Sequence, residues 1–164
     1  MELKQITINP IGIVHTPFNN VEGMPIQPLA AKGIKGYIAL FPEYIEGLKD
    51  LDGFSHITLL YYFHKIKGYN LTVKPFMDTL EHGIFATKSP KRPNSIGFST
   101  VKLLGIEKNI IHIEMVDMLN ETPLIDIKPF FSRFDNRINT KSGWLDKPEN
   151  LPIENLRADT RFKN

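Results

Sequence analysis

Cysteine is absent from all 164 residues of the sequence. The chain therefore forms no disulfide, no thiolate metal site and no cysteine nucleophile. Its apolar runs are shorter than the ~20 residues that a membrane-spanning helix needs. The N-terminal Met-Glu-Leu-Lys-Gln also lacks the pattern of a secretory signal. We expect a cytoplasmic protein that does not contact a membrane.

Several signatures of nucleotide and hydrolytic enzymes are also missing. The sequence has no GxxxxGK[ST], no GxGxxG after a strand, no HExxH and no GxSxG. The histidines His56 and His64 form no close HxxH or HxH pair, so we expect no metal. A net charge of +2 does not indicate a nucleic-acid-binding protein, so any nucleic-acid contact has to be a local patch.

The apolar pattern that is present predicts a mainly β fold. Alternating or continuous apolar stretches predict about seven strands, over residues 5–14, 37–40, 56–64, 84–86, 98–106, 110–118 and 122–130. The first carries a bend at Pro10 and Gly12, and the pair 98–106 and 110–118 reads as an antiparallel hairpin. Strands that follow strands through short turns favour a small single-domain β-barrel, mostly antiparallel.

One or two short helices accompany the strands. Pro42 and Glu43 suit a first helical turn, and Tyr44, Ile45, Leu48 and Leu51 form an apolar stripe over residues 42–51. A second helix, over 153–162, is weakly indicated.

The pattern fades after Phe131, which predicts an extended C-terminal arm. We expect a barrel domain over 1–130 and an arm over 131–164 that includes 135–137, the single Trp144 and Pro148 to Pro152. An arm with so few apolar anchors has to pack on the barrel or on a second subunit.

The run from Ile84 to Ser99 is the most informative stretch. Its two prolines, Pro90 and Pro93, stiffen a loop. The same loop carries three cations, Lys88, Lys91 and Arg92. A stiff cationic loop suits an anionic ligand such as phosphate or carboxylate. A solvated surface turn explains the same residues equally well, and Arg92 alone could instead form a salt bridge to another loop.

Four segments, in order, resemble one known family. They are Asn9–Val14, Leu51–His64, Phe85–Gly97 and Asp117–Pro129 with a gap at 120–121. Together they resemble the TsaA-like, or TrmO, family, in its compact archaeal form. The resemblance implies an S-adenosylmethionine-dependent methyltransferase that modifies N6 of threonylcarbamoyladenosine at tRNA position 37. It also implies a small β-barrel, a homodimer and a cofactor bound near the subunit interface.

The resemblance also implies a set of cofactor-binding residues. They are Pro25, Ile26, Gln27, His64, Lys65, Lys88, Thr100, Asp117, Met118, Leu119 and Asn120. Several positions depart from the family pattern. Ile26 and Lys88 replace arginine-like positions, and Lys88 offers a charge without the bidentate fork. Asn120-Glu121 replaces Asp-Gly, and a glutamate is strained where a glycine reaches positive φ. Ser95 replaces a proline, and Phe130 replaces a tyrosine.

Methyl transfer to a urea-like N6 needs a group that accepts or polarises the N–H. The candidate catalytic residues are Asp126, Asp117 and His64. Asp126 equally suits a bracing role in a strand, ion-paired with Lys128 on the same face. For the tRNA backbone or the threonyl carboxylate we predict Lys91, Arg92, Asn94 and Lys128 as substrate-binding residues.

Two alternatives remain open at this stage. The departures at Asn120-Glu121 and Phe130, with the low net charge, fit an S-adenosylmethionine-dependent methyltransferase for another acceptor. The missing family side chains also fit a non-enzymatic S-adenosylmethionine-binding protein.

Overall fold

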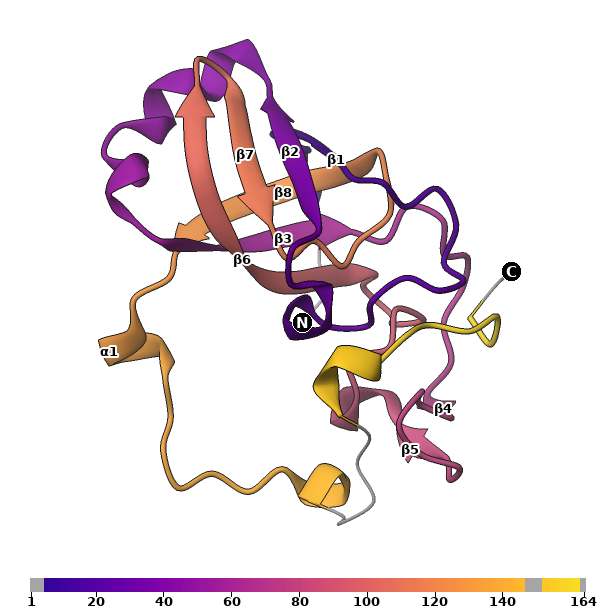
Figure 1. Ribbon diagram of the computed structural model, residues 1–164. Helices are drawn as coiled ribbons and strands as arrows, with labels where there is room; N and C mark the ends of the chain where they lie inside the picture. Colours follow the sequence, from indigo (N-terminus) through magenta and orange to yellow (C-terminus); the bar gives the residue numbers. More distant parts are fainter. Residues whose placement is uncertain (1–4, 147–151, 163–164) are drawn as a thin grey trace.

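A closed barrel of six antiparallel strands forms the body of the protein (Figure 1). The computed structural model describes residues 5–146 and 152–162. In barrel order the strands are β1 (Gly12–His15), β2 (Lys35–Leu40), β7 (Ile110–Glu114), β6 (Ile96–Glu107), β3 (His56–Tyr62) and β8 (Thr122–Pro129). The predicted small, mostly antiparallel β-barrel is confirmed.

The barrel interior is filled by the inward-facing residues of each strand. Alternate side chains of β6 are buried, in the order expected for a half-buried strand. The apolar core includes Val14, Ile38, Ile57, Leu59, Val101, Ile111, Ile113 and Leu124. The predicted hairpin is confirmed as β6 and β7, which turn at Lys108 with a φ of 56°.

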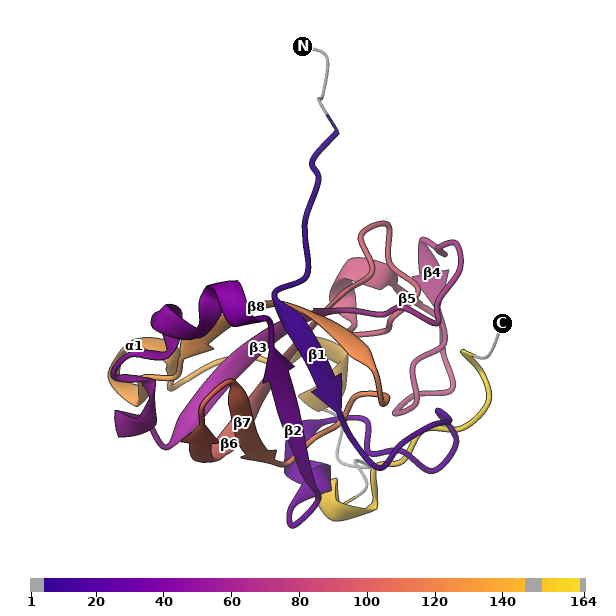
Figure 2. The ribbon, with the colours of Figure 1, turned by 90° about the horizontal axis from the view of Figure 1, so that it is seen from above.

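Three predicted strands are shorter by two residues or more in the structure. The first begins only at Gly12; Ile6 and Ile8 are exposed, and residues 5–10 lead away from the barrel (Figure 2). Pro10 has no backbone N–H to donate to a ladder, which explains the late start. The strand over 56–64 ends at Tyr62, and the one over 110–118 ends at Glu114, before Met115 adopts a φ of 73°.

The predicted strand over 84–86 is wrong. These residues form a 3-10 turn, η4 (Ile84–Ala86), in which only Ile84 is buried. The preceding residues form a two-residue strand, β5 (His82–Gly83), paired with β4 (Thr72–Val73). Three apolar residues are too few to distinguish a strand from a turn by periodicity.

The predicted helix over 42–51 forms as 3-10 helix rather than α-helix. It consists of η2 (Pro42–Leu48) and η3 (Leu51–Gly53), separated by Asp50 at a φ of 64°. Leu48 and Leu51 pack on the core, whereas Tyr44 and Ile45 stay exposed. Only Leu48 and Leu51 of the apolar stripe therefore pack against the end of the barrel. The remaining short helices of the described chain are η1 (Pro28–Ala31), α1 (Ser132–Asp135), η5 (Gly143–Asp146) and η6 (Ile153–Asn155).

The end of the chain folds back on the long loop after β1. The backbone N–H of Gly23 donates to the Ala158 carbonyl at 2.9 Å, and the N–H of Ala158 donates to the Met24 carbonyl at 2.8 Å. Leu156 and Ala158 are buried there, and η6 contacts η1. The predicted helix over 153–162 is wrong, since only Ile153–Asn155 is helical.

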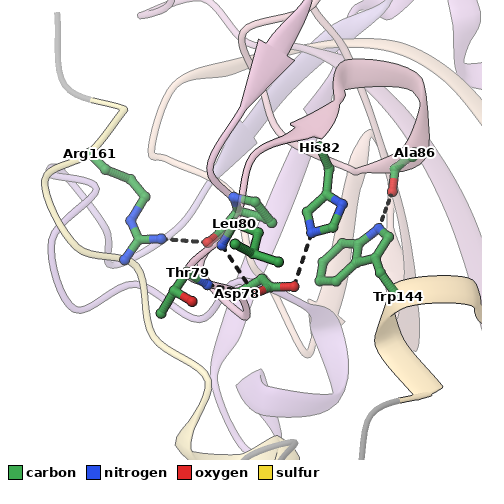
Figure 3. Close-up of polar contacts among 8 residues, drawn as sticks. Asp78, Thr79, Leu80, His82, Ala86, Trp144 and Arg161 are labelled. Atoms are coloured by element: carbon green, nitrogen blue, oxygen red, sulfur yellow. Dashed lines mark hydrogen bonds and ion pairs between the residues drawn. The ribbon is translucent and has the colours of Figure 1, made fainter.

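Trp144 anchors the other described part of the C-terminal segment (Figure 3). Its ring stacks on His82 with centroids 4.5 Å apart, and its Nε1 donates to the Ala86 carbonyl at 2.8 Å. Nε2 of His82 lies 3.0 Å from Oδ2 of Asp78, and the Arg161 side chain donates to the Pro75 carbonyl. These contacts hold the segment on the loops beside the barrel of the same chain. Of the predicted arm, Pro148 to Leu151 lie outside the described residues, and the division at 130 stays a prediction.

Candidate functional site

The candidate site lies where β3 ends and β6 begins. Tyr62 pairs with Ile96 at this end of the two strands. The segment after β7, residues 115–121, arrives at the same place because Ser99 of β6 donates a hydrogen bond to Asp117. Lys88 is close enough to Asp117 for its positive charge to lower the pKa of that carboxyl group. The fold thus brings together Lys88, His64 and residues 117–119, which the sequence predicts as cofactor-binding.

Three side chains linked by hydrogen bonds, those of Tyr61, Ser99 and Asp117, form the centre of this site. The Ser99 hydroxyl donates to Oδ1 of Asp117 at 2.6 Å, and the Tyr61 hydroxyl lies 3.0 Å from the same Ser99 oxygen. Because the Ser99 proton goes to the carboxylate, Tyr61 has to be the donor to Ser99. Burial raises the pKa of Tyr61, so its hydroxyl keeps its proton.

The acidity of Asp117 is strongly changed by this environment. Burial raises its pKa from 3.8 to about 7, against the opposing effects of the Ser99 hydrogen bond and of Lys88. A carboxyl group with a pKa near neutral pH can both accept and release a proton under physiological conditions. Groups of this kind are concentrated at functional sites.

Gly97 allows the Tyr61 ring to occupy its position. The two residues face each other across β3 and β6. A Cβ built on Gly97 would lie 2.2 Å from a ring carbon of Tyr61. The glycine therefore leaves the space through which Tyr61 reaches Ser99.

The segment from Asp117 to Thr122 is held by hydrogen bonds to Thr16, which follows β1. Thr16 donates its hydroxyl to the Met118 carbonyl at 2.9 Å, and Asn120 accepts from the backbone N–H of Thr16 at 3.2 Å. Glu121 has a φ of 62°, so this glutamate adopts the left-handed conformation that a glycine takes without strain. Beside this segment lies a hollow of about 390 Å³ lined by His15, Tyr37, Asn120 and neighbours.

His64 presents an unpaired nitrogen to the site. Its Nδ1 lies 3.5 Å from the Thr122 hydroxyl, which itself donates to the Leu119 carbonyl. Its Nε2 is shielded from solvent and finds no hydrogen-bond partner among the described residues. Burial lowers the pKa of His64, so the neutral ring is favoured. A buried nitrogen without a partner is costly unless a ligand satisfies it.

The cations of the proline-containing loop have different roles. Arg92 donates through Nη1 to three carbonyls of its own loop, those of Ile84, Thr87 and Ser89, at 3.3, 2.7 and 3.4 Å. Arg92 therefore braces its own loop, and it forms no salt bridge within the described part of the chain. Lys88, by contrast, is exposed and lies over the Phe98 ring at 5.9 Å.

Three predicted site residues lie away from this centre. Asp126 is paired with Lys128 at 2.8 Å, as the bracing hypothesis expects. Both lie on β8 beyond Thr122, and four residues of strand place Asp126 ~13 Å along from Thr122. Thr100 bonds Thr58 at 3.0 Å, on the opposite face of β6 from the buried Ser99.

The remaining predicted residues border the site. Pro25, Ile26 and Gln27 lead into η1, which contacts β6, and they are held by the C-terminal segment through Pro25 and Arg157. Lys65 and Asn94 are exposed on the loops after β3 and before β6.

Sequence reasoning missed Ser99 and Tyr61. The available signal was the period of two along β6, since Val101 and Leu103 are core positions and Ser99 shares their face. Tyr61 could be recognised because Gly97 lies opposite it in the neighbouring strand, but that pairing is known only once the strand register is known.

The described residues contain no group of three or more side chains suited to hold a metal ion. Within the same part of the chain, no helix has the length and apolarity required to span a membrane.

Comparison with known proteins places this arrangement in context. Residues 13–136 match the model of the tRNA-methyltransferase O N-terminal domain. A probable S-adenosyl-L-methionine-binding protein of Pyrococcus abyssi is 49% identical over 96% of this chain and 85% of its own length. The human tRNA (adenine(37)-N6)-methyltransferase is 32% identical over 89% of this chain but only 35% of its own.

A solved structure supports the same relationship. The crystal structure of TrmO from Pseudomonas aeruginosa superimposes with a TM-score of 0.75 at 34% identity. The match covers 90% of this chain and 64% of that one, so this chain spans less than two thirds of that enzyme.

Proposed function

This chain belongs to the tRNA-methyltransferase O N-terminal domain family, and we propose that it transfers a methyl group from S-adenosylmethionine to N6 of adenosine 37 in tRNA. The observation that carries the proposal is the Asp117 carboxyl. It has a pKa of about 7, is hydrogen-bonded to Ser99 and lies within the influence of Lys88.

The residues at the site fit S-adenosylmethionine. Lys88 offers a charge for the carboxylate of its methionine part. The unpartnered Nε2 of His64 is a further polar atom that a ligand can satisfy. When bound, the cofactor supplies a methyl carbon activated by its sulfonium.

Asp117 acts as the proton acceptor in this proposal. In its ionised form it accepts the proton that N6 loses as the new N–C bond forms. Ser99 and Tyr61 are positioning residues. Ser99 is hydrogen-bonded to Asp117 and Tyr61 to Ser99, and together they hold the carboxylate in one orientation. The neutral ring of His64 orients the acceptor through Nε2.

The finer parts of the proposal concern the substrate and the assembly. The threonylcarbamoyl form of the adenosine is the substrate, and its carboxylate pairs with Lys91. The protein works in the cytoplasm, as a homodimer.

Mass spectrometry of tRNA nucleosides tests the function. Purified protein is incubated with S-adenosylmethionine and two tRNAs, one carrying threonylcarbamoyladenosine and one unmodified transcript. We expect the modified nucleoside to become heavier by one methylene, only in the first tRNA and only with cofactor. No mass change in either tRNA, with cofactor binding shown by calorimetry, contradicts the proposal. A change in the transcript alone contradicts the finer substrate.

A further inference from the structure

Cationic charge is concentrated in two stretches of the chain, 62–71 and 84–98. They contain five cations and no acidic residue: Lys65, Lys67, Lys88, Lys91 and Arg92. The rest of the chain has 15 Lys and Arg against 18 Asp and Glu, a net charge of −3. The overall charge of +2 thus hides a local positive region.

The two stretches lie side by side in the fold. The backbone N–H of Phe63 donates to the Ser95 carbonyl at 2.8 Å, and that of Asn70 donates to the Lys91 carbonyl at 3.2 Å. The cations therefore share one region, at the end of β3 and β6 that carries the candidate site.

Two aromatic rings lie on the outer face of these strands. Tyr62 and Phe98 are 45% and 58% exposed, while their chain neighbours Tyr61, Gly97 and Ser99 are buried. Tyr62 pairs with Ile96 and Phe98 with Leu60. The two residues are therefore diagonal neighbours on adjacent strands, with backbones ~7–8 Å apart.

The adjoining loops add two more exposed rings. Tyr69 is 58% exposed and Phe85 is 78% exposed. We call the four rings, with Lys65, Lys67, Lys88 and Lys91, the aromatic–cationic surface. Lys88 joins this surface to the site, because it lies over Phe98 and acts on the charge of Asp117.

We propose that the aromatic–cationic surface binds unpaired RNA nucleotides beside the target base, by stacking on Tyr62 and Phe98 and by pairing of phosphates with Lys65 and Lys67. This inference rests on the proposed function. Aromatic rings on the outer face of a sheet are a recurrent means of holding single-stranded RNA bases. Surrounding cations supply the phosphate contacts. Position 37 lies in an unpaired loop, so its neighbours are free to stack.

A second copy of this chain is a poorer occupant of the same surface. A two-fold interface places the same patch of both subunits against itself. Here that would set four lysines against four, without an acidic residue in either stretch. RNA instead provides both the negative charge and the planar rings that the surface matches.

Fluorescence anisotropy with a labelled anticodon stem-loop RNA tests the surface. The variants are Phe98→Leu and Tyr62→Leu, which keep apolar bulk but remove the ring, and Phe98→Trp, which keeps a ring. The matched control is Phe134→Leu, because Phe134 is 67% exposed and belongs to α1, away from β4 and β5 in both views (Figures 1 and 2). A fully paired RNA hairpin without a loop is the second probe.

We expect each leucine variant to weaken stem-loop binding about 5- to 150-fold, as loss of one base–aromatic stack does. Phe98→Trp and Phe134→Leu should bind like the wild type, and the paired hairpin should bind more weakly than the stem-loop. Unchanged binding in both leucine variants overturns the proposal. So does a wild type that binds no RNA, or a dimer, measured by light scattering, that Phe98→Leu dissociates.

Asp117→Asn separates this inference from the proposed function. The variant should bind the stem-loop like the wild type while methyl transfer is lost. If no tRNA is methylated but Phe98→Leu and Tyr62→Leu lose affinity for the stem-loop, the proposed function is wrong and the proposed RNA-binding surface is supported. If tRNA is methylated and the ring variants bind and react like the wild type, only the surface fails.

Discussion

Two aspartates in this chain, Asp117 and Asp126, look equally suited to catalysis in the sequence but occupy opposite environments. Asp126 is 42% exposed and paired with Lys128. Asp117 faces inward to a serine, and burial raises its pKa to about 7. The difference teaches that burial, rather than residue type or motif membership, gives one of the two a pKa close to neutral pH.

The surroundings of the two aspartates differ in the same sense. Asp126 lines a hollow of about 490 Å³ together with Glu43 and Asp50 at the end covered by η2 and η3. Asp117 lies at the end where Lys88 and the other loop cations gather. The proposed tRNA substrate, which is anionic, is therefore attracted more strongly to the Asp117 end than to the other.

The largest expected effect separates the two aspartates by activity. Asp117→Asn keeps the shape and the acceptor for Ser99 but cannot accept a proton. We expect methyl transfer to fall by about 10²- to 10⁴-fold, the usual contribution of a positioned base. Asp126→Asn, assayed in parallel on the same tRNA, should stay within about twofold of the wild type. Equal losses in the two variants would remove the distinction.

The next effect concerns stability and its dependence on pH. The folded-state pKa of Asp117 is about 7, above the value of 3.8 expected when the chain is unfolded. The stability that protonated Asp117 provides is therefore complete below about pH 4 and lost as the pH rises through about 7. Asp117→Asn does not titrate, so relative to the wild type it should gain up to about 4 kcal/mol between pH 4 and pH 8.

Urea unfolding at the two pH values measures this gain. Asp126→Asn is the control. Its partner Lys128 is exposed, so loss of this ion pair should change the free energy of unfolding by less than about 1 kcal/mol at either pH. A difference between the wild type and Asp117→Asn that is the same at pH 4 and pH 8 would contradict the raised pKa.

A third prediction compares glycines from the two ends of the barrel. Gly97→Ala places a methyl group 2.2 Å from the Tyr61 ring, whereas nothing lies within 4 Å of a Cβ at Gly47 in η2. Overpacking should make Gly97→Ala less stable by about 1–3 kcal/mol. Gly47→Ala should be neutral or more stable by up to about 1 kcal/mol. Thermal unfolding of both variants checks the pair, and tolerance of alanine at 97 would mean that the Tyr61 ring is not fixed.

The sequence predicted well those features that depend on local pattern. The hairpin of β6 and β7 follows from alternation at Val101, Leu103, Ile111 and Ile113, and the barrel follows from strands joined by short turns. The helical type of 42–48 and the turn at 84–86 did not follow, because short apolar runs fit more than one conformation.

The site divides in the same way. Lys88 and Asp117 each belong to a short motif and were predicted through the family resemblance. Glu121 adopts the left-handed conformation despite the strain that the sequence analysis expects for a glutamate there. Ser99 and Tyr61 were not predicted, because their contacts join residues 18 and 38 positions apart through the sheet register. Thr100 was chosen one residue from Ser99, and a shift of one residue in a strand reverses the face.

The smallest expected effect concerns the ion pair at the Asp126 end. Lys128→Ala removes the partner of Asp126 from an exposed position, where both side chains keep contact with water. An exposed ion pair contributes about 0.2–1 kcal/mol, and salt screens it. A double-mutant cycle with Asp126→Ala, measured by urea unfolding at low and at 1 M salt, isolates the coupling. We expect it to vanish at high salt; a coupling well above 1 kcal/mol that persists there would mean that Asp126 is held as firmly as Asp117, and burial would no longer distinguish the two.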